Sequence, residues 1–501
     1  MYPKTLLILI VVSTAAVCHA SERPNLLLFL VDDMGIGDTS VPMFYRNGKR
    51  EPIDSNQLYR TPNMESLARQ GRLFTNAYAY SVCSPTRISL MTGQSAVRHR
   101  VTTWTHPKSS KIDTGLVESS GIKSPPEWRI MGLDRSLPLL PRLLKDAGYR
   151  TLFAGKAHFG PDDTPSGNPI NLGFAVNIAG FGGGGPGSYW GTYNYSANHR
   201  TGEHVWDVPG LEKYHGTDTF LTEAITLEMN DAIKDSVNKR QPFFAYMSHY
   251  AVHAPWLYPD TRFVENYPGL KGQGLAFATL VEGMDKSLGD VLRHLDDLGV
   301  AEETLVIFLS DNGSAWASNA PYRDKKGSRF EGGLRVPMIV AWAKPNPKHP
   351  LQKRYPIETG TVEHDIVTCV DVMPTLIKLA NANLPADALI DGHDLSPYFF
   401  GDAGTHRPQE FLTHFPHRHR NTLFSTLRID RWKIIYQYAN GGWELYNLEE
   451  DPLETENLVV IERNKAKQMA IALIDRLDSQ KAQYPVDART NQIVKPSVDS
   501  L

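Results

Sequence analysis

The sequence predicts an α/β fold with a large, mostly parallel sheet flanked by helices on both faces, plus a smaller C-terminal α+β domain with an antiparallel sheet. Short apolar runs typical of strands buried on both faces alternate with amphipathic helices that end in glycine, which favours a parallel sheet. Near Gly401 the composition becomes rich in His and Arg, and two strand-like runs follow. We therefore expect a segment 1–20, a large domain 21–402 and a small domain 403–501.

The first 20 residues are typical of a secretory signal peptide. One lysine precedes the apolar run Leu6–Val12, and a Cys-His-Ala tripeptide ends at Ala20. Because the run is too short for a membrane span, we expect an exported protein, periplasmic or secreted, without stable membrane insertion. The remaining Cys83 and Cys369 make no disulfide framework, and a net charge of −3 disfavours a nucleic-acid partner.

Strand and helix patterns then follow in order. Asn25–Val31 is apolar throughout, and units of helix, glycine and strand occupy 61–78, 137–154 and 284–309. A further strand is predicted at 243–247 and a helix at 371–380. The C-terminal part has predicted strands at 423–428 and 432–438 and a last helix at 465–479.

Polar side chains follow four of these strands, at the points where they end. They are Asp32 and Asp33, Lys156 and His158, His249 and His253, and Asp311 and Asn312. Because ligands bind at the carboxyl ends of parallel strands, we expect these groups at one edge of the sheet.

The acidic members of this set predict a metal site. Asp32, Asp33, Asp311 and Asn312 offer oxygen atoms, which suit calcium or magnesium better than zinc. Three clustered carboxylates would also be costly to bury without a cation. Asp38, farther along the loop, is expected to tolerate substitution.

A thiol precedes a predicted helix in the segment 80–93. Ser84 is expected to cap the helix, Pro85 to take its first position and Gly93 to end it. Cys83 would then lie at the positive end of the helix, with Arg87 one turn inside, which predicts an anion site. Alone, such a cysteine is more often an ordinary buried thiol.

The order of residues in this segment resembles a family signature. Cys83-Ser84-Pro85-Thr86-Arg87 followed by Leu-Met-Thr-Gly resembles the maturation signature of the type I sulfatases of the alkaline phosphatase superfamily, usually Cys-x-Pro-x-Arg with a trailing Thr-Gly. Thr86 departs from the serine or alanine that is commoner there. For a serine that helps to hold sulfate in some members, the segment 181–190 offers Ser188 as the nearest candidate.

Other motifs extend the resemblance from Asn25 to Leu458. The chain matches the family's Asp-Asp with Asp-Asn-Gly, Gly-Lys-x-His, His-x-Pro and Lys-Gly-x-x-x-Glu-Gly-Gly motifs. The last three pass through Lys156, His158, His253 and Lys326, so the adjacent His249 and Lys325 rank lower.

The resemblance implies a sulfate ester hydrolase whose Cys83 is oxidised to formylglycine by a maturation enzyme. It implies calcium, with magnesium as the alternative, bound by Asp32, Asp33, residue 83, Asp311 and Asn312. Arg87 and Lys156 would help to hold the sulfate. Asp311 would take the proton of the attacking hydroxyl, His253 and Lys326 would protonate the leaving alcohol, and His158 would deprotonate the second hydroxyl.

Loop aromatics at Trp104, Trp128 and Trp256 and a glycine-rich loop at 181–190 favour a sulfated carbohydrate substrate, although each ring could equally pack as core. The alternatives are an arylsulfatase, a phosphatase or phosphonate hydrolase of the superfamily, and a secreted glycan-binding pseudo-sulfatase. Asn312 in place of a His ligand disfavours the phosphatase, and the intact Cys83, Arg87 and acidic residues disfavour the pseudo-sulfatase.

Overall fold

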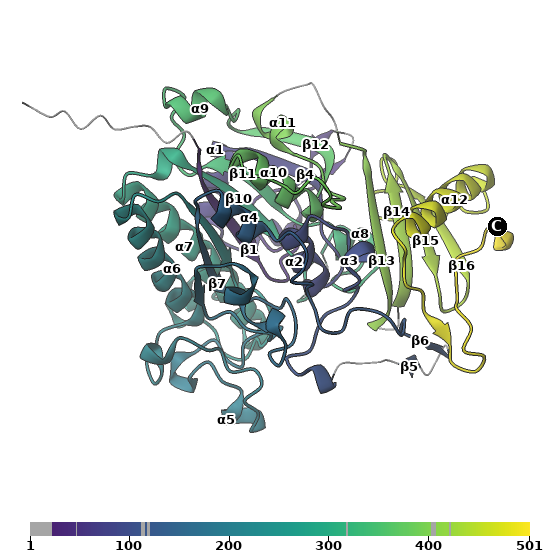
Figure 1. Ribbon diagram of the computed structural model, residues 1–501, viewed down its shortest axis with the longest axis horizontal. Coiled ribbons are helices and arrows are strands. Elements are labelled where there is room, and N and C mark those ends of the chain that lie inside the picture. The colour runs from purple at the N-terminus through teal and green to yellow at the C-terminus, as the bar shows by residue number, and fades with distance from the viewer. Residues whose placement is uncertain are drawn as a thin grey trace, which may run out of the picture.

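The computed structural model describes residues 23–501 apart from 47, 112–115, 118–120, 317–318, 402–406 and 420–421. It has two parts, a large sheet covered by helices and a smaller C-terminal sheet beside it (Figure 1). The predicted signal peptide and the predicted boundary at 402 lie outside the described residues, so the domain limits stay predictions.

The large sheet has eight strands. Their spatial order is β12 (Thr361–Thr368), β4 (Arg72–Tyr78), β11 (Met338–Trp342), β10 (Thr304–Ser310), β1 (Asn25–Val31), β9 (Phe243–Ser248), β7 (Arg150–Gly155) and β8 (Val176–Ile178). The central strand β1 pairs in parallel with β9 and β10, whereas β11 runs antiparallel to both of its neighbours. The mostly parallel sheet is therefore confirmed.

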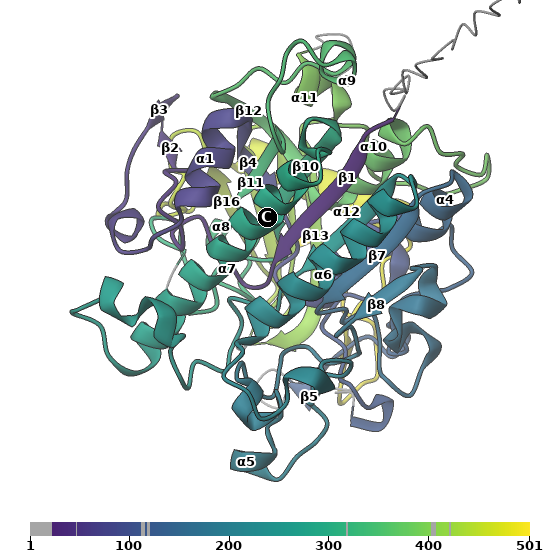
Figure 2. The ribbon, with the colours of Figure 1, turned by 90° about the vertical axis from the view of Figure 1, so that its left-hand side faces the viewer.

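Helices cover both faces of this sheet, because successive side chains of β1 enter two different cores. Leu26, Leu28 and Leu30 pack on the side of α2 (Cys83–Thr92), α4 (Leu140–Asp146) and α10 (Val372–Leu379). Leu27 and Phe29 pack on the side of α1 (Pro62–Gln70), α6 (Leu221–Asn238) and α7 (Gly272–Asp297). Figure 2 shows α6 and α7 in front of the sheet. Burial on both faces explains why β1 is apolar throughout.

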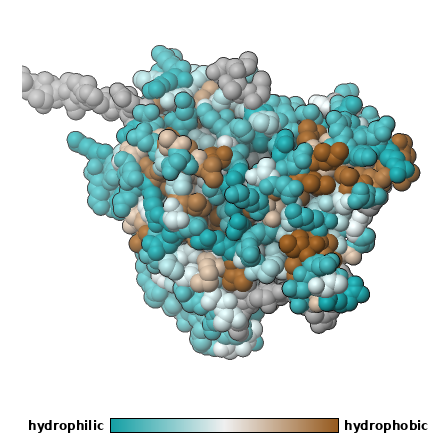
Figure 3. Space-filling view, turned by 45° about the vertical axis from the view of Figure 1, so that its right-hand side comes forward, coloured by the Kyte–Doolittle hydropathy of each residue, from teal (hydrophilic) through white to brown (hydrophobic). Residues whose placement is uncertain are grey.

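The C-terminal part is an antiparallel sheet with its own core. Its strands are β13 (Glu410–His419), β14 (Thr422–Ile429), β15 (Trp432–Gln437) and β16 (Gly442–Asn447), and the helix α12 (Arg463–Ser479) packs on them through Leu473 and Leu477. This confirms the predicted α+β architecture. Figure 3 brings this side of the molecule forward; Val460 and Ile461, between β16 and α12, are among its most exposed apolar side chains.

A buried ionic network joins the two parts. Lys433 on β15 is 1% exposed and pairs with Glu331 at 2.9 Å and with Glu454 at 2.8 Å. Glu331 begins the short helix α8 (Glu331–Leu334) and also pairs with Arg335 at 2.8 Å. Removing one member of such a buried set leaves an unpaired buried charge and typically lowers the free energy of unfolding by about 3–5 kcal/mol. The small sheet thus fixes the loop that carries Lys326, five residues before Glu331.

In the part of the chain that the structure describes, no helix is long and apolar enough to cross a bilayer.

Candidate active site

The four predicted strand ends do meet, because β10, β1, β9 and β7 are adjacent in the sheet. Asp32 and Asp33 follow β1, and Asp311 and Asn312 follow β10. The backbone N–H of Asp33 donates to Oδ1 of Asp311 at 3.0 Å, which joins the two acidic loops directly.

Cys83 reaches the same edge on helix α2. The helix begins at Cys83, with Val82 as its N-cap, so the expectation that Ser84 caps it was wrong. The hydroxyl of Ser84 instead donates to the carbonyl of His158 at 3.1 Å. Gly93 ends the helix in the left-handed region, at φ 63°, as expected. Cys83 therefore lies at the first helical position, where free N–H groups favour anions.

Each of the three carboxylates is paired with a different cation. Asp311 Oδ2 accepts from Arg87 Nε at 2.8 Å, Asp32 Oδ2 lies 2.6 Å from Lys156 Nζ, and Asp33 Oδ1 lies 2.5 Å from Lys326 Nζ. All six side chains are 10% exposed or less. The charges therefore balance within the protein. In the sequence analysis, the free-energy cost of burying three carboxylates was an argument for a metal. In the structure, the three basic side chains offset this cost.

Burial and these partners set the protonation of the acids. Burial raises the pKa of Asp33, but Lys326 and His253 outweigh it and hold the pKa well below its usual range. Burial also opposes ionisation of Asp311, yet its pKa is lowered, chiefly by Arg87. Asp32 differs, because burial raises its pKa far above the usual value despite Lys156.

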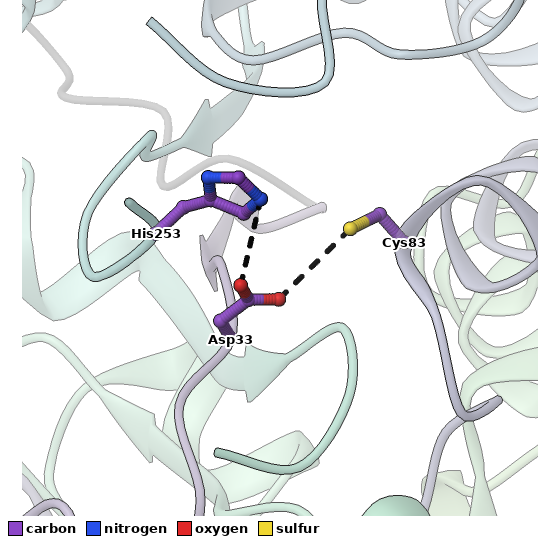
Figure 4. Close-up of side chains that lie close together, drawn as sticks. All are labelled: Asp33, Cys83 and His253. Atoms are coloured by element: carbon purple, nitrogen blue, oxygen red, sulfur yellow. Dashed lines mark hydrogen bonds and ion pairs between the residues drawn. The ribbon is translucent and has the colours of Figure 1, made fainter. Parts of the chain in front are cut away.

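Cys83 lies against this cluster. Lys326 Nζ donates to its sulfur at 3.2 Å, and the sulfur lies 3.6 Å from Asp32 Oδ1 and 3.9 Å from Asp33 Oδ1 (Figure 4 shows Cys83, Asp33 and His253). Burial raises the pKa of the Cys83 thiol to about 12, although Lys156 and Lys326 oppose the shift. The encoded thiol is thus protonated at neutral pH and is a poor nucleophile.

The two histidines have defined tautomers. His158 Nε2 donates to the carbonyl of Thr105 at 2.7 Å, and its buried Nδ1 has no hydrogen-bond partner among the described residues. Burial, aided by Lys156, holds the pKa of His158 well below its usual value, so the ring is neutral and Nδ1 is a free base. His253 Nδ1 donates to the carbonyl of Ala254 at 2.8 Å, which leaves Nε2 3.6 Å from Asp33 Oδ2.

The same group can hold a metal. Donor atoms of Asp32, Asp33, Cys83 and Asp311 all lie within 4.8 Å of one another. Asn312 donates to Asp33 Oδ1 at 2.8 Å, whereas its own buried Oδ1 accepts no hydrogen bond from the part of the chain that the structure describes. Such an unsatisfied acceptor beside carboxylates is what a hard cation requires, so the oxygen donors fit calcium or magnesium.

A cavity of about 420 Å³ opens above Cys83, lined also by His158, His253 and Lys326. One wall is the glycine loop, by which we mean residues 182–187. A Cβ atom on Gly184 would lie 2.7 Å from Cε1 of His158, and one on Gly185 would lie 2.8 Å from Nδ1 of His253. The loop can rest on both rings because it has no side chains at these positions.

Several residues weighed in the sequence lie elsewhere. His249 bonds Ser287 at 2.9 Å and packs against Phe29, and Lys325 donates to the carbonyl of Trp316. The hydroxyl of Ser188 accepts from the N–H of Trp190 at 3.1 Å.

Of the three singled-out tryptophans, Trp104 lines the cavity, whereas Trp128 packs on His417 and Trp256 on Trp316. Four neighbours of the site were given no role in the sequence analysis: Thr105, Ser248, Arg200 and Trp206. Ser248 accepts from Arg87 Nη1 at 2.7 Å, and Arg200 and Trp206 line the mouth of the cavity.

Comparison with known proteins agrees with this geometry. Residues 24–382 match the Sulfatase family, and residues 322–483 match the C-terminal region of N-sulphoglucosamine sulphohydrolase. The mouse N-acetylgalactosamine-6-sulfatase is 31% identical over 456 residues, which cover 88% of this chain and 77% of that one. A sulfatase of Formosa agariphila is 28% identical over 518 residues, covering 88% of this chain and 85% of that one.

Among solved structures, Ps i-CgsB, also solved in complex with k-i-k-neocarrahexaose, has a TM-score of 0.72 at 24% identity and covers 92% of this chain and 94% of its own. Fold and site together define a hydrolase of the alkaline phosphatase superfamily. More narrowly, the chain belongs to the sulfatase family and is a sulfuric ester hydrolase.

Substituting Gly184 by alanine should lower activity without unfolding the protein. Because the added methyl group would push His158 away, we expect kcat/KM for sulfate ester hydrolysis to fall roughly 100-fold, the scale of a misplaced catalytic group. Steady-state kinetics and thermal melting measure both effects. Gly269→Ala is the matched control, since nothing lies within 4 Å of the added atom. Wild-type kinetics for Gly184→Ala would show that the position of His158 does not matter.

Proposed function

We propose that this sulfatase hydrolyses sulfate esters of carbohydrates, with a formylglycine formed from Cys83 and a bound calcium ion. The observation that carries the proposal is the buried thiol of Cys83 on the cavity floor, in contact with Lys326 and two carboxylates. The unmodified thiol is a poor nucleophile, but it lies on the cavity floor beside the polar groups of the site. Its oxidation by a maturation enzyme, in a periplasmic or secreted protein, completes the site.

In this mechanism one hydroxyl of the hydrated aldehyde at position 83 attacks sulfur. Asp311, ionised beside Arg87, accepts the proton of that hydroxyl. His158, with Nδ1 unpartnered, removes the proton of the second hydroxyl, which allows sulfate to leave. Lys326 protonates the departing alcohol, whereas His253, whose pKa burial lowers to about 3 and whose Nδ1–H is bonded to Ala254, stays neutral beside it. Burial lowers the pKa of Lys326, but Asp33 reverses this and holds it above its usual value, so the lysine carries a proton to give.

Calcium would be held by Asp32, Asp33, residue 83, Asp311 and Asn312, and when bound it supplies positive charge that stabilises the sulfate oxygens. Lys156 and Lys326, now paired with Asp32 and Asp33, would then be available to donate to the ester. Arg87 has no exposed surface, and its Nη2 lies 3.6 Å from Asp32 Oδ1 and makes no hydrogen bond to the described residues. Its part is to keep Asp311 ionised and in place.

A sulfated carbohydrate is the substrate class that the cavity supports. Trp104, 39% exposed, and Trp206 offer ring faces at the mouth, and sugars stack on such faces. The similar mouse enzyme is named for a sulfated amino sugar, and Ps i-CgsB was crystallised with a neocarrahexaose.

A panel of defined sulfated oligosaccharides tests the substrate class. We expect free sulfate to be released from at least one algal or glycosaminoglycan fragment with a higher kcat/KM than from simple aryl sulfates, because contacts to remote sugars can stabilise the transition state. Aryl sulfates supply the comparison within the same assay. Rejection of every oligosaccharide together with rapid aryl sulfate hydrolysis would make the protein an arylsulfatase instead.

Mass spectrometry of the peptide that contains position 83 tests the modification. Protein from a host with a formylglycine-generating enzyme should carry an aldehyde or its hydrate there, and protein from a host without it should keep the thiol. Cys83→Ala should abolish turnover and leave the melting temperature nearly unchanged. Full activity of protein with an unmodified thiol would refute the proposed nucleophile.

Metal removal tests the ligand set. Chelation should release one calcium ion per site and abolish turnover, and calcium should restore activity better than zinc, because the protein donors are oxygen atoms. Metal analysis, which needs no activity assay, should find that Asp33→Ala has lost its bound calcium. Asp297→Ala, on the exposed end of α7, should retain it. Retention of stoichiometric calcium by Asp33→Ala would remove Asp33 from the ligand set.

A further inference from the structure

The cavity has two zones of different character. Its floor carries Cys83, His158, His253 and Lys326, which form the site of the proposed reaction. Its mouth carries three side chains that the reaction does not use: Trp104, Arg200 and Trp206. A sulfate ester that reaches the floor must place the rest of its sugar between these three side chains. They are therefore positioned to select the substrate.

Arg200 differs from the cation on the floor. Lys326 pairs with Asp33 at 2.5 Å. Arg200, on the short helix α5 (Asn198–Thr201), is exposed, and its Nη2 donates to the carbonyl of Gly187 at 3.0 Å. Among the described residues no carboxylate forms an ion pair with it. The bond to Gly187 thus holds the side chain at the cavity, and its other guanidinium N–H groups are left for a ligand.

The glycine loop connects Arg200 to the two histidines of the site. Gly187 ends the glycine loop whose Gly184 and Gly185 rest on His158 and His253. The N–H of Gly187 donates to the carbonyl of Trp206 at 2.7 Å, and the ring of Trp206 packs edge-on against His106, with centroids 5.7 Å apart. One loop thus links the two histidines to the cation and to a ring at the mouth.

We propose that Arg200, flanked by Trp104 and Trp206, binds a second anionic group of the substrate, carried by the sugar next to the scissile sulfate. This inference rests on the proposed carbohydrate substrate and narrows it to oligosaccharides with a carboxylate or a further sulfate on that sugar. A guanidinium fork matches the oxygens of either group, and the ring faces of the tryptophans accept the apolar faces of the sugar. A neutral neighbouring sugar would offer Arg200 no opposite charge.

The test compares kcat/KM of the matured holoenzyme on three oligosaccharides with the same scissile sulfate. The neighbouring sugar is neutral in the first, a uronate in the second and sulfated in the third. Arg200→Gln should lower kcat/KM about 10-fold on the charged substrates, in line with the loss of a charge-assisted hydrogen bond, and less than about 2-fold on the neutral one. For the wild type, added salt should reduce the preference in kcat/KM for the charged substrates over the neutral one, because salt screens an exposed ionic contact such as that of Arg200.

Two further variants separate charge from structure. Arg200→Lys keeps the charge and should recover part of the loss on the charged substrates. Arg240→Gln, exposed just before β9 at the opposite end of the strands, should change none of the rates. A loss confined to the uronate assigns a carboxylate to the subsite, and a loss confined to the sulfated neighbour assigns a sulfate; both support the proposal.

An equal fall on all three substrates would show that Arg200 only supports Gly187, and no fall would show that it binds nothing; both overturn the subsite. If the wild type released sulfate from none of the three, and from no other sulfated sugar, the proposed function would fail instead. The two failures are thus distinguishable.

Discussion

The balance of charge at the end of the central strands is the constraint on which the rest of this structure depends. Three carboxylates are buried within a few ångströms of one another, and burying such charges is costly unless each is paired and hydrogen-bonded. Their cations come from three different places: Arg87 from helix α2, Lys156 from the end of β7, and Lys326 from the loop before α8. The positions of these elements are therefore coupled through the site.

The C-terminal sheet takes part in this coupling although none of its described residues lines the cavity. Lys433 and Glu454 hold Glu331, whose backbone N–H donates to Glu454 at 2.6 Å. Glu331 begins α8, directly after the loop that carries Lys326. The C-terminal sheet thus supports the position of Lys326, the proposed acid of the reaction.

Much of this arrangement could be predicted from the sequence because buried parallel strands are apolar throughout, and the polar residues after them stand out. The strands ending before Asp32, Lys156 and Asp311 were placed within a residue or two, and the edge where they meet followed from the parallel topology. Helix starts were less certain: Ser84 was expected to be the N-cap, but the N-cap is Val82 and the helix begins two residues earlier than expected, at Cys83.

Contacts that depend on the path of long loops could not be predicted. Arg200 and Trp206 have no local pattern that marks them, and they reach the cavity only because the glycine loop folds back over the histidines. Asp38 was expected to tolerate change, but it is 2% exposed and accepts from the N–H of Gly35 at 2.8 Å. Burial raises its pKa to about 7, although the N–H of Gly35 opposes the shift.

The glycine loop has a consequence for how this enzyme can diversify. Gly184 and Gly185 lie so close to the rings of His158 and His253 that a side chain at either position would displace a ring at the site of the proposed reaction. Variation that changes substrate preference must therefore enter at the rim, on α5 and around Trp104 and Trp206, where side chains face the cavity without touching the histidines. A directed-evolution library confined to these rim positions would explore new sugars while leaving the reaction itself intact.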